Sequence, residues 1–319
     1  MKTTFYRLLL IIFTISLYSC AHDEEERVIR IGTNVWPGYE PLYLAREMKL
    51  FSSEEIQLVE YQSASEVIRA FRNHLLEAAS LTIDEALLLK NDNIPVKIVL
   101  IHDISAGADV ILAKPEIRNF ADLKGKRIGV ESTALGAFVL TRAAQINNMN
   151  ISDFEIIKLE INLHKQSYLN NEVDAVVTFD PVRTNLIKAG AHEIFNSNQI
   201  PGEVVDVMVV HEDTLKSGKK RLKAIVNAWF EALEYFNKET DSAARIMAKR
   251  LRIEPEEVIA SYEGLKLPDR NTNLRLMDGV NPKLEETSVH LAEVLFKNKL
   301  INSPIDTRGM VTSELLFEK

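Results

Sequence analysis

The chain has 319 residues, 46% of them hydrophobic, and a formal net charge of -8. This apolar content supports a substantial buried core, which excludes a disordered chain and allows one large domain or two ordinary ones. Nucleic acid is not expected as a partner, because phosphate binding needs a concentrated basic surface and the sequence contains none.

The N-terminus has the pattern of an export signal. Lys2 and Arg7 precede the mainly apolar run LLLIIFTISL (residues 8–17), which suits a signal-peptide core and is too short to span a bilayer. The run ends in LYSC, which resembles the bacterial lipobox and finishes at Cys20, the only cysteine. We therefore predict a lipoprotein signal peptide over residues 1–19, a lipid anchor on Cys20 and a charged tether over residues 20–27. The alternative is a stray cysteine after a buried helix.

The stretch WPGYEPLYLA (residues 36–45) follows the apolar run VIRIGTN (28–34). A Pro-Gly turn and then helical spacing of apolar residues predict a strand, a turn and a helix. Such a turn lies at the carboxyl edge of an α/β sheet, where Trp36 and Tyr39 would face a ligand cleft. The alternative is that both aromatics only cap the helix against the sheet.

Further strands alternate with helices. The first set of strands is predicted at 56–61, 78–82 and 96–101, and capping-box patterns start the intervening helices at Ser63 and Thr82. This alternation predicts a mainly parallel sheet covered on both faces.

A second set of strands and a helical segment complete the chain. The second set of strands is predicted at 109–115, 154–160, 174–180, 192–197 and 204–211, with one further strand that ends at Glu131. From Glu212 onward, only helices are expected. We predict a discontinuous first lobe over 28–108 and 206–319 and a second lobe over 109–205.

Several motifs together resemble one family. They are WPGYEPLYLA, LTIDEALLL (81–89), DISAGADVILAKP (103–115), DLKGKRIGVESTALG (122–136), EVDAVVTFDPV (172–182) and IPGEVVDVMVV (200–210). In this order they are similar to type 2 periplasmic solute-binding proteins of ABC importers, in the group of nitrate, sulfonate, taurine and thiamine-precursor receptors. The resemblance implies an α/β fold of two lobes that close on a small molecule, two crossover segments near 104–109 and 204–207, and C-terminal helices packed on the first lobe.

Turns after the predicted strands supply the candidate ligand-binding residues. In the first lobe they are Trp36, Gly38, Tyr39, Ser63, Ser65, Thr82, Asp84 and Asp103, and in the second lobe Glu131, Ser132, Thr133, Ala134, Phe179 and Asp180. Ser132 and Thr133 stand at a helix start, where free N–H groups hold anions, or they are ordinary N-caps.

The charges at these turns favour one class of ligand. Asp84, Asp103, Glu131 and Asp180 fall at the cleft edge, whereas the same turns carry no lysine or arginine and Arg183 is the nearest base. Together with possible cation–π faces, this favours a cationic or zwitterionic amine. The alternative is that Asp84 and Asp180 only cap helices. The histidines are scattered, so neither a metal nor a cofactor is expected.

The resemblance implies an exported, lipid-anchored protein of the bacterial periplasm or cell surface that delivers its ligand to an ABC permease and is not an enzyme. Two alternatives stay open: a sensory subunit that docks on a membrane signalling protein, and an enzyme of the same fold. The export signal and the lack of a convincing acid–base pair argue against the enzyme.

Overall fold

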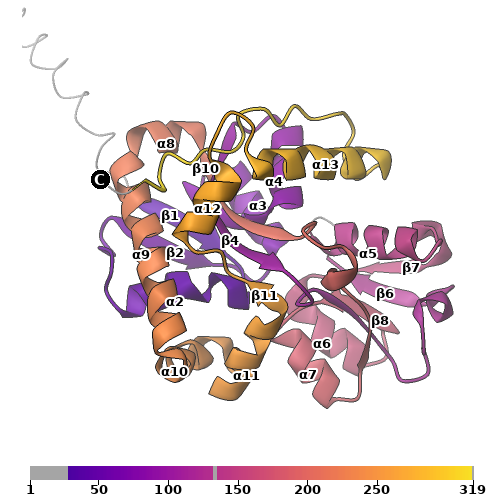
Figure 1. Cartoon of the computed structure of the whole chain (residues 1–319). Coiled ribbons are helices and arrows are strands. Elements are labelled where there is room, and N and C mark those ends of the chain that lie inside the picture. Colours follow the sequence, from indigo (N-terminus) through magenta and orange to yellow (C-terminus); the bar gives the residue numbers. More distant parts are fainter. Residues whose placement is uncertain (1–27, 132–134, 318–319) are drawn as a thin grey trace, which may run out of the picture.

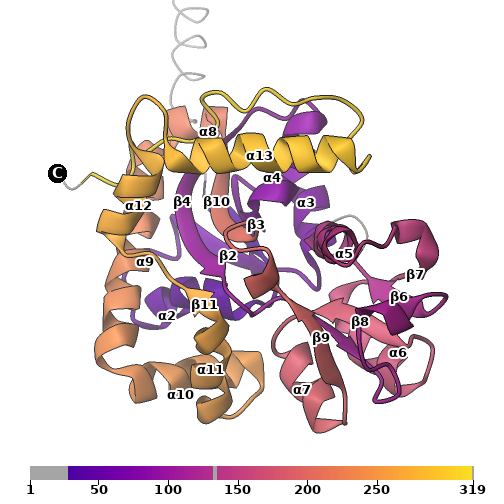
Figure 2. The same cartoon turned by 45° about the vertical axis from the view of Figure 1, so that its right-hand side comes forward.

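The computed structural model describes residues 28–131 and 135–317. Two sheets define two lobes that lie side by side, with the C-terminal helices on the larger one (Figures 1 and 2). The chain passes from the larger to the smaller sheet after Ser105 and returns before Val205.

The larger sheet has the strand order β11-β4-β10-β3-β1-β2. Its strands are β1 (Ile29–Thr33), β2 (Ile56–Glu60), β3 (Ala78–Thr82), β4 (Val96–Ser105), β10 (Val205–His211) and β11 (Leu265–Lys266). β1 pairs in parallel with β2 and β3, but β10 runs antiparallel between β3 and β4. The sheet is therefore more mixed than predicted, because the chain returning from the second lobe enters it in the opposite direction.

The smaller sheet has the order β7-β6-β8-β5-β9. Its strands are β5 (Val110–Ala113), β6 (Arg127–Val130), β7 (Glu155–Lys158), β8 (Ala175–Thr178) and β9 (His192–Asn196). Valine and isoleucine dominate most of these short runs, as suits buried strands. The helices of this lobe are α5 (Leu135–Ile146), α6 (Ile161–Leu169) and α7 (Val182–Lys188).

The remaining helices belong to the larger lobe. They are α2 (Glu40–Glu47), α3 (Ala64–Arg72), α4 (Ile83–Asn91), α8 (Glu212–Ser217), α9 (Lys219–Lys238), α10 (Thr240–Leu251), α11 (Pro255–Ser261), α12 (Arg270–Met277) and α13 (Lys283–Lys297). α9 packs against α2, and α13 packs against α4. The expectation of helices alone after Glu212 is wrong at β11, which pairs with β4. In the described ranges, no helix has the length and apolar character needed to cross a membrane.

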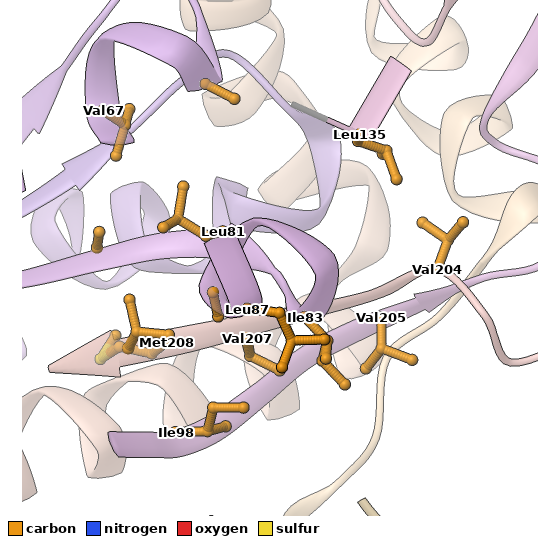
Figure 3. Packing of buried hydrophobic residues seen from close by; sticks show 14 of the residues in the cluster. Val67, Leu81, Ile83, Leu87, Ile98, Leu135, Val204, Val205, Val207 and Met208 are labelled. Carbon is orange, nitrogen blue, oxygen red and sulfur yellow. The ribbon is translucent and has the colours of Figure 1, made fainter. Parts of the chain in front are cut away.

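The main core surrounds the larger sheet and continues into the second lobe. Leu81 of β3, Met208 of β10 and Ile98 of β4 are fully buried. Figure 3 shows Ile83 and Leu87 of α4 close to the side chains of β10. This packing fixes the carboxyl ends of β3 and β4, where the candidate site lies.

Candidate ligand-binding site between the lobes

The turn between β1 and α2 forms hydrogen bonds with β4 and β10, the two strands that connect to the second lobe. The indole Nε1 of Trp36 donates to Asp103 Oδ2 of β4 at 3.0 Å, and the Tyr39 hydroxyl donates to Asp206 Oδ1 of β10. At Gly38, a Cβ atom would stand 1.9 Å from Asp103 Oδ2 and 2.3 Å from Trp36 Nε1. The absence of a side chain therefore lets the turn approach both strands closely.

Side chains of the two lobes meet next to this turn. The Phe179 ring of the second lobe packs edge-on against Trp36, with the ring centroids 5.0 Å apart. Nearby, the Ser63 hydroxyl of the first lobe donates to Glu160 Oε2 of the second lobe at 3.0 Å. The lobes are thus held in direct contact.

A cavity of about 30 Å³ lies between the lobes, with room for about one or two water molecules. It is lined by Asn34, Trp36, Tyr39, Ala64, Thr82, Glu85, Asp109, Glu131, Leu135, Gly136, Val139, Ile161, His164, Val177, Thr178, Phe179 and Asp206. Four of these described residues are acidic, and none is a lysine or arginine. In the described part of the chain, no group of three His, Cys, Asp or Glu side chains is placed to hold a metal ion.

Burial dominates the protonation of the acidic side chains around the cavity. It raises the pKa of Glu85 to about 8 and the pKa of Asp109 to about 7. Burial also raises the pKa values of Glu131, Asp103 and Asp206. The last two carboxyls face each other in the β4–β10 register, and repulsion from Asp103 raises the pKa of Asp206 further. Several of these carboxyls therefore hold protons near neutral pH.

Five lining residues carry a buried polar atom without a hydrogen-bond partner in the described part of the chain. The atoms are Thr82 Oγ1, Asp109 Oδ2, His164 Nδ1, Thr178 Oγ1 and Asp206 Oδ2. Burial lowers the pKa of His164 to about 4, so its imidazole is neutral near pH 7. Because an unpaired buried polar group costs about 1–3 kcal/mol, these atoms favour a ligand with hydrogen-bonding groups.

The structure brings five of the predicted site residues to the cavity wall. They are Trp36, Tyr39, Thr82, Glu131 and Phe179. Gly38 and Asp103 do not line the cavity, and they lie against Trp36 instead. Ser132, Thr133 and Ala134 fall outside the described residues, as does Cys20.

The other predicted residues have different surroundings. Ser63 caps α3 by accepting from the Glu66 backbone N–H at 3.3 Å. Ser65 and Asp84 line a separate groove of about 450 Å³. Asp180 accepts from the Thr184 backbone N–H at 2.9 Å. The interpretation of Asp180 as a helix-capping carboxylate therefore describes its contacts.

Sequence reasoning missed three acidic residues of the cavity wall: Glu85, Asp109 and Asp206. Glu85 is the acidic residue of the capping-box pattern that begins at Thr82, and its Oε2 accepts from the Thr82 backbone N–H at 2.9 Å. For Asp206, the available signal was a carboxylate inside the apolar run VVDVMVVH (204–211), where a buried charge needs a reason.

Two antiparallel strands linking two α/β lobes, with a polar cavity between the lobes, define the fold of the substrate-binding proteins of ABC importers. The chain belongs to the NMT1-like family, whose model matches residues 22–252. This confirms the resemblance and the fold class predicted from the sequence.

Solved structures share this fold at low sequence identity. The alkanesulfonate-binding protein SsuA from Xanthomonas axonopodis pv. citri, bound to MOPS, aligns with a TM-score of 0.74 and 15% identity over 87% of this chain and 95% of that chain. The periplasmic aliphatic sulphonate-binding protein SsuA from Escherichia coli aligns with a TM-score of 0.73 and 18% identity over 92% of this chain and 99% of that chain.

A binding protein of Brucella abortus is a relative by sequence. It is 23% identical over 162 residues, which are 50% of this chain and 50% of the relative. The chain thus spans about half the length of the curated relatives it matches.

Proposed function

We propose that this protein is an exported, lipid-anchored solute-binding protein that captures a small cationic or zwitterionic amine and delivers it to an ABC import permease. In this proposal it performs no chemistry itself. The observation that carries the ligand class is the described cavity wall, where four side chains are acidic and none is a lysine or arginine. A bound cation favours the ionised form of these carboxyls, and a low-dielectric interior strengthens the charge–charge attraction that results.

The aromatic side chains support the same class of ligand. Trp36 and Tyr39 line the cavity and are held in place through Asp103 and Asp206. Fixed aromatic faces attract ammonium groups. The solved relatives are named for sulfonates, but a sulfonate would meet acidic groups here and no lysine or arginine among the described lining residues.

Ligand entry requires the lobes to separate. The cavity of about 30 Å³ is far smaller than the several hundred Å³ of a typical ligand site. We propose that the first lobe (28–108 and 206–319) and the second lobe (109–205) move apart at the segments after β4 and before β10. They then close again on the ligand.

A thermal-shift screen of the purified protein tests this function. Because a ligand that binds only the folded state raises the melting temperature, primary and quaternary amines and zwitterionic amino acids should include compounds that raise it. Alkanesulfonates without an amino group should not. A screen in which only sulfonates or other anions stabilise the protein would contradict the proposed ligand class.

The proposed anchor makes a separate prediction. Cys20→Ser should move the protein from the membrane fraction to the soluble extracytoplasmic fraction, because a thioether-linked lipid needs the thiol. Immunoblots of fractionated cells measure the distribution, and Ser19→Ala, which keeps the thiol, is the matched control. An unchanged membrane fraction for Cys20→Ser would rule out this anchor.

A further inference from the structure

Two carboxyl groups cross between the lobes in a reciprocal arrangement. Glu131 follows β6 in the second lobe, and its Oε1 accepts from the Ser65 backbone N–H in the first turn of α3 at 2.8 Å. Glu85 belongs to α4 of the first lobe, and its Oε1 accepts from the Leu135 backbone N–H at the start of α5 at 3.2 Å. Both side chains are buried. Each lobe therefore provides one helix start and one carboxyl group.

The first N–H groups of a helix have no partner within the helix, and the helix dipole makes this end positive. Carboxylates, sulfonates and phosphates bind there. In this protein the starts of α3 and α5 each hold a carboxyl group from the opposite lobe.

We propose that Glu85 and Glu131 are built-in stand-ins for an anionic ligand, which occupy the anion positions of α3 and α5 and thereby exclude oxyanions from the cavity. This inference rests on the proposed function and names the residues that set its specificity. It differs from simple charge repulsion, because occupation of the N–H groups does not require a negative charge: the carbonyl oxygen of a neutral carboxyl or of an amide also accepts a hydrogen bond.

The remaining cavity wall strengthens the discrimination against oxyanions. An oxyanion that displaced Glu131 from Ser65 would enter a small cavity beside Asp109 and Asp206. The displaced carboxyl would also lose its backbone donor while staying buried, which is unfavourable. An ammonium group accepts no hydrogen bond and does not compete for the backbone N–H, so it leaves both stand-ins in place.

Ethanesulfonate and ethylamine are suitable probes, since they differ mainly in the head group. Isothermal titration of the purified wild-type protein should detect no ethanesulfonate binding. Glu131→Ala frees the start of α3, and Glu131→Ala together with Glu85→Ala frees the starts of α3 and α5. Each variant should bind ethanesulfonate at least about tenfold more tightly than the weakest binding that the wild-type titration would detect.

Two variants separate occupation from other effects. Glu131→Gln keeps an acceptor of the same size and should still exclude ethanesulfonate. Glu160→Ala also removes a contact between the lobes, at Ser63 and Arg69, but lies outside the cavity lining and should behave as the wild type. Circular dichroism establishes that each variant is folded.

Three results would overturn the inference: ethanesulfonate binding by the wild-type protein, no gain in folded Glu131→Ala, or an equal gain in Glu131→Gln. The wild-type measurement needs no variant to fold. The ethylamine titration reports on the proposed function separately, because the alanine variants can gain sulfonate binding even if the wild type binds no amine.

Discussion

Replacing Gly38 with alanine will lower the free energy of unfolding by about 3 kcal/mol and will weaken ligand binding. The new Cβ would stand 1.9 Å from Asp103 Oδ2 and 2.3 Å from Trp36 Nε1, so the turn or the strand must move. Either movement breaks the bond between the Trp36 indole and Asp103 and leaves a buried carboxyl without its donor. Urea denaturation measures the loss of stability.

A double-mutant cycle tests the cause. Asp103→Ala removes the nearest obstructing atom, so Gly38→Ala should cost clearly less in that background than in the wild type. An equal cost in both backgrounds would mean that the close approach to Asp103 is not the reason for glycine at this position.

The order of strands and helices could be predicted because local signals agree along this chain. Runs rich in β-branched residues such as AVVT (175–178) end at turns, and Ser63 and Thr82 stand at helix starts. The pairing of strands could not be predicted in this way. Nothing local in VVDVMVVH tells that β10 enters antiparallel between β3 and β4, because all seven residues of the strand are buried and show no alternation.

The candidate site could be predicted at its turns but not at single side chains. Asp84 and Glu85 are adjacent at the start of α4, and a helix turns by about 100° per residue. This rotation sends Glu85 to the cavity and Asp84 to a different groove. Of the four acidic residues predicted at the cleft edge, only Glu131 lines the cavity. The choice between neighbours depends on how the helix is rotated on its sheet.

The contact between the lobes required the three-dimensional structure. Glu131 and Ser65 are 66 positions apart, and Glu85 and Leu135 are 50 positions apart. Neither pair has a recognisable local pattern. From the sequence, Glu131 is predicted only as a ligand contact and Glu85 only as a capping residue. Their hydrogen bonds across the lobes could not be predicted.

Lowering the pH from 9 to 7 will stabilise the ligand-free protein by on the order of 3 kcal/mol. In this window the folded state takes up protons at Glu85, with a pKa of about 8, and partly at Asp109, with a pKa of about 7. Burial also raises the pKa values of Asp103 and Asp206. The unfolded chain keeps these groups ionised, since ordinary carboxyl pKa values lie near about 4. The folded state therefore binds more protons, and its stability rises as the pH falls.

The buried histidines limit this window on the acid side. Burial lowers the pKa of His102 to about 3 and the pKa of His164 to about 4. Below about pH 6.5, these two histidines therefore bind protons in the unfolded chain but not in the folded state, which lowers the stability. Urea denaturation at pH 7, 8 and 9 measures the trend. Glu85→Gln should reduce the slope, and Glu293→Gln on the exposed face of α13 should leave it unchanged.

A bound amine should reduce the dependence of the free energy of unfolding on pH. The ammonium group favours ionised carboxyls, so the complex holds fewer protons than the ligand-free protein, and amine affinity should rise from pH 6 to pH 8. Stability that is constant or increases between pH 7 and 9 without ligand would show that the cavity carboxyls are already ionised. In that case the cation would meet charges that are present in advance, and its binding would release no protons.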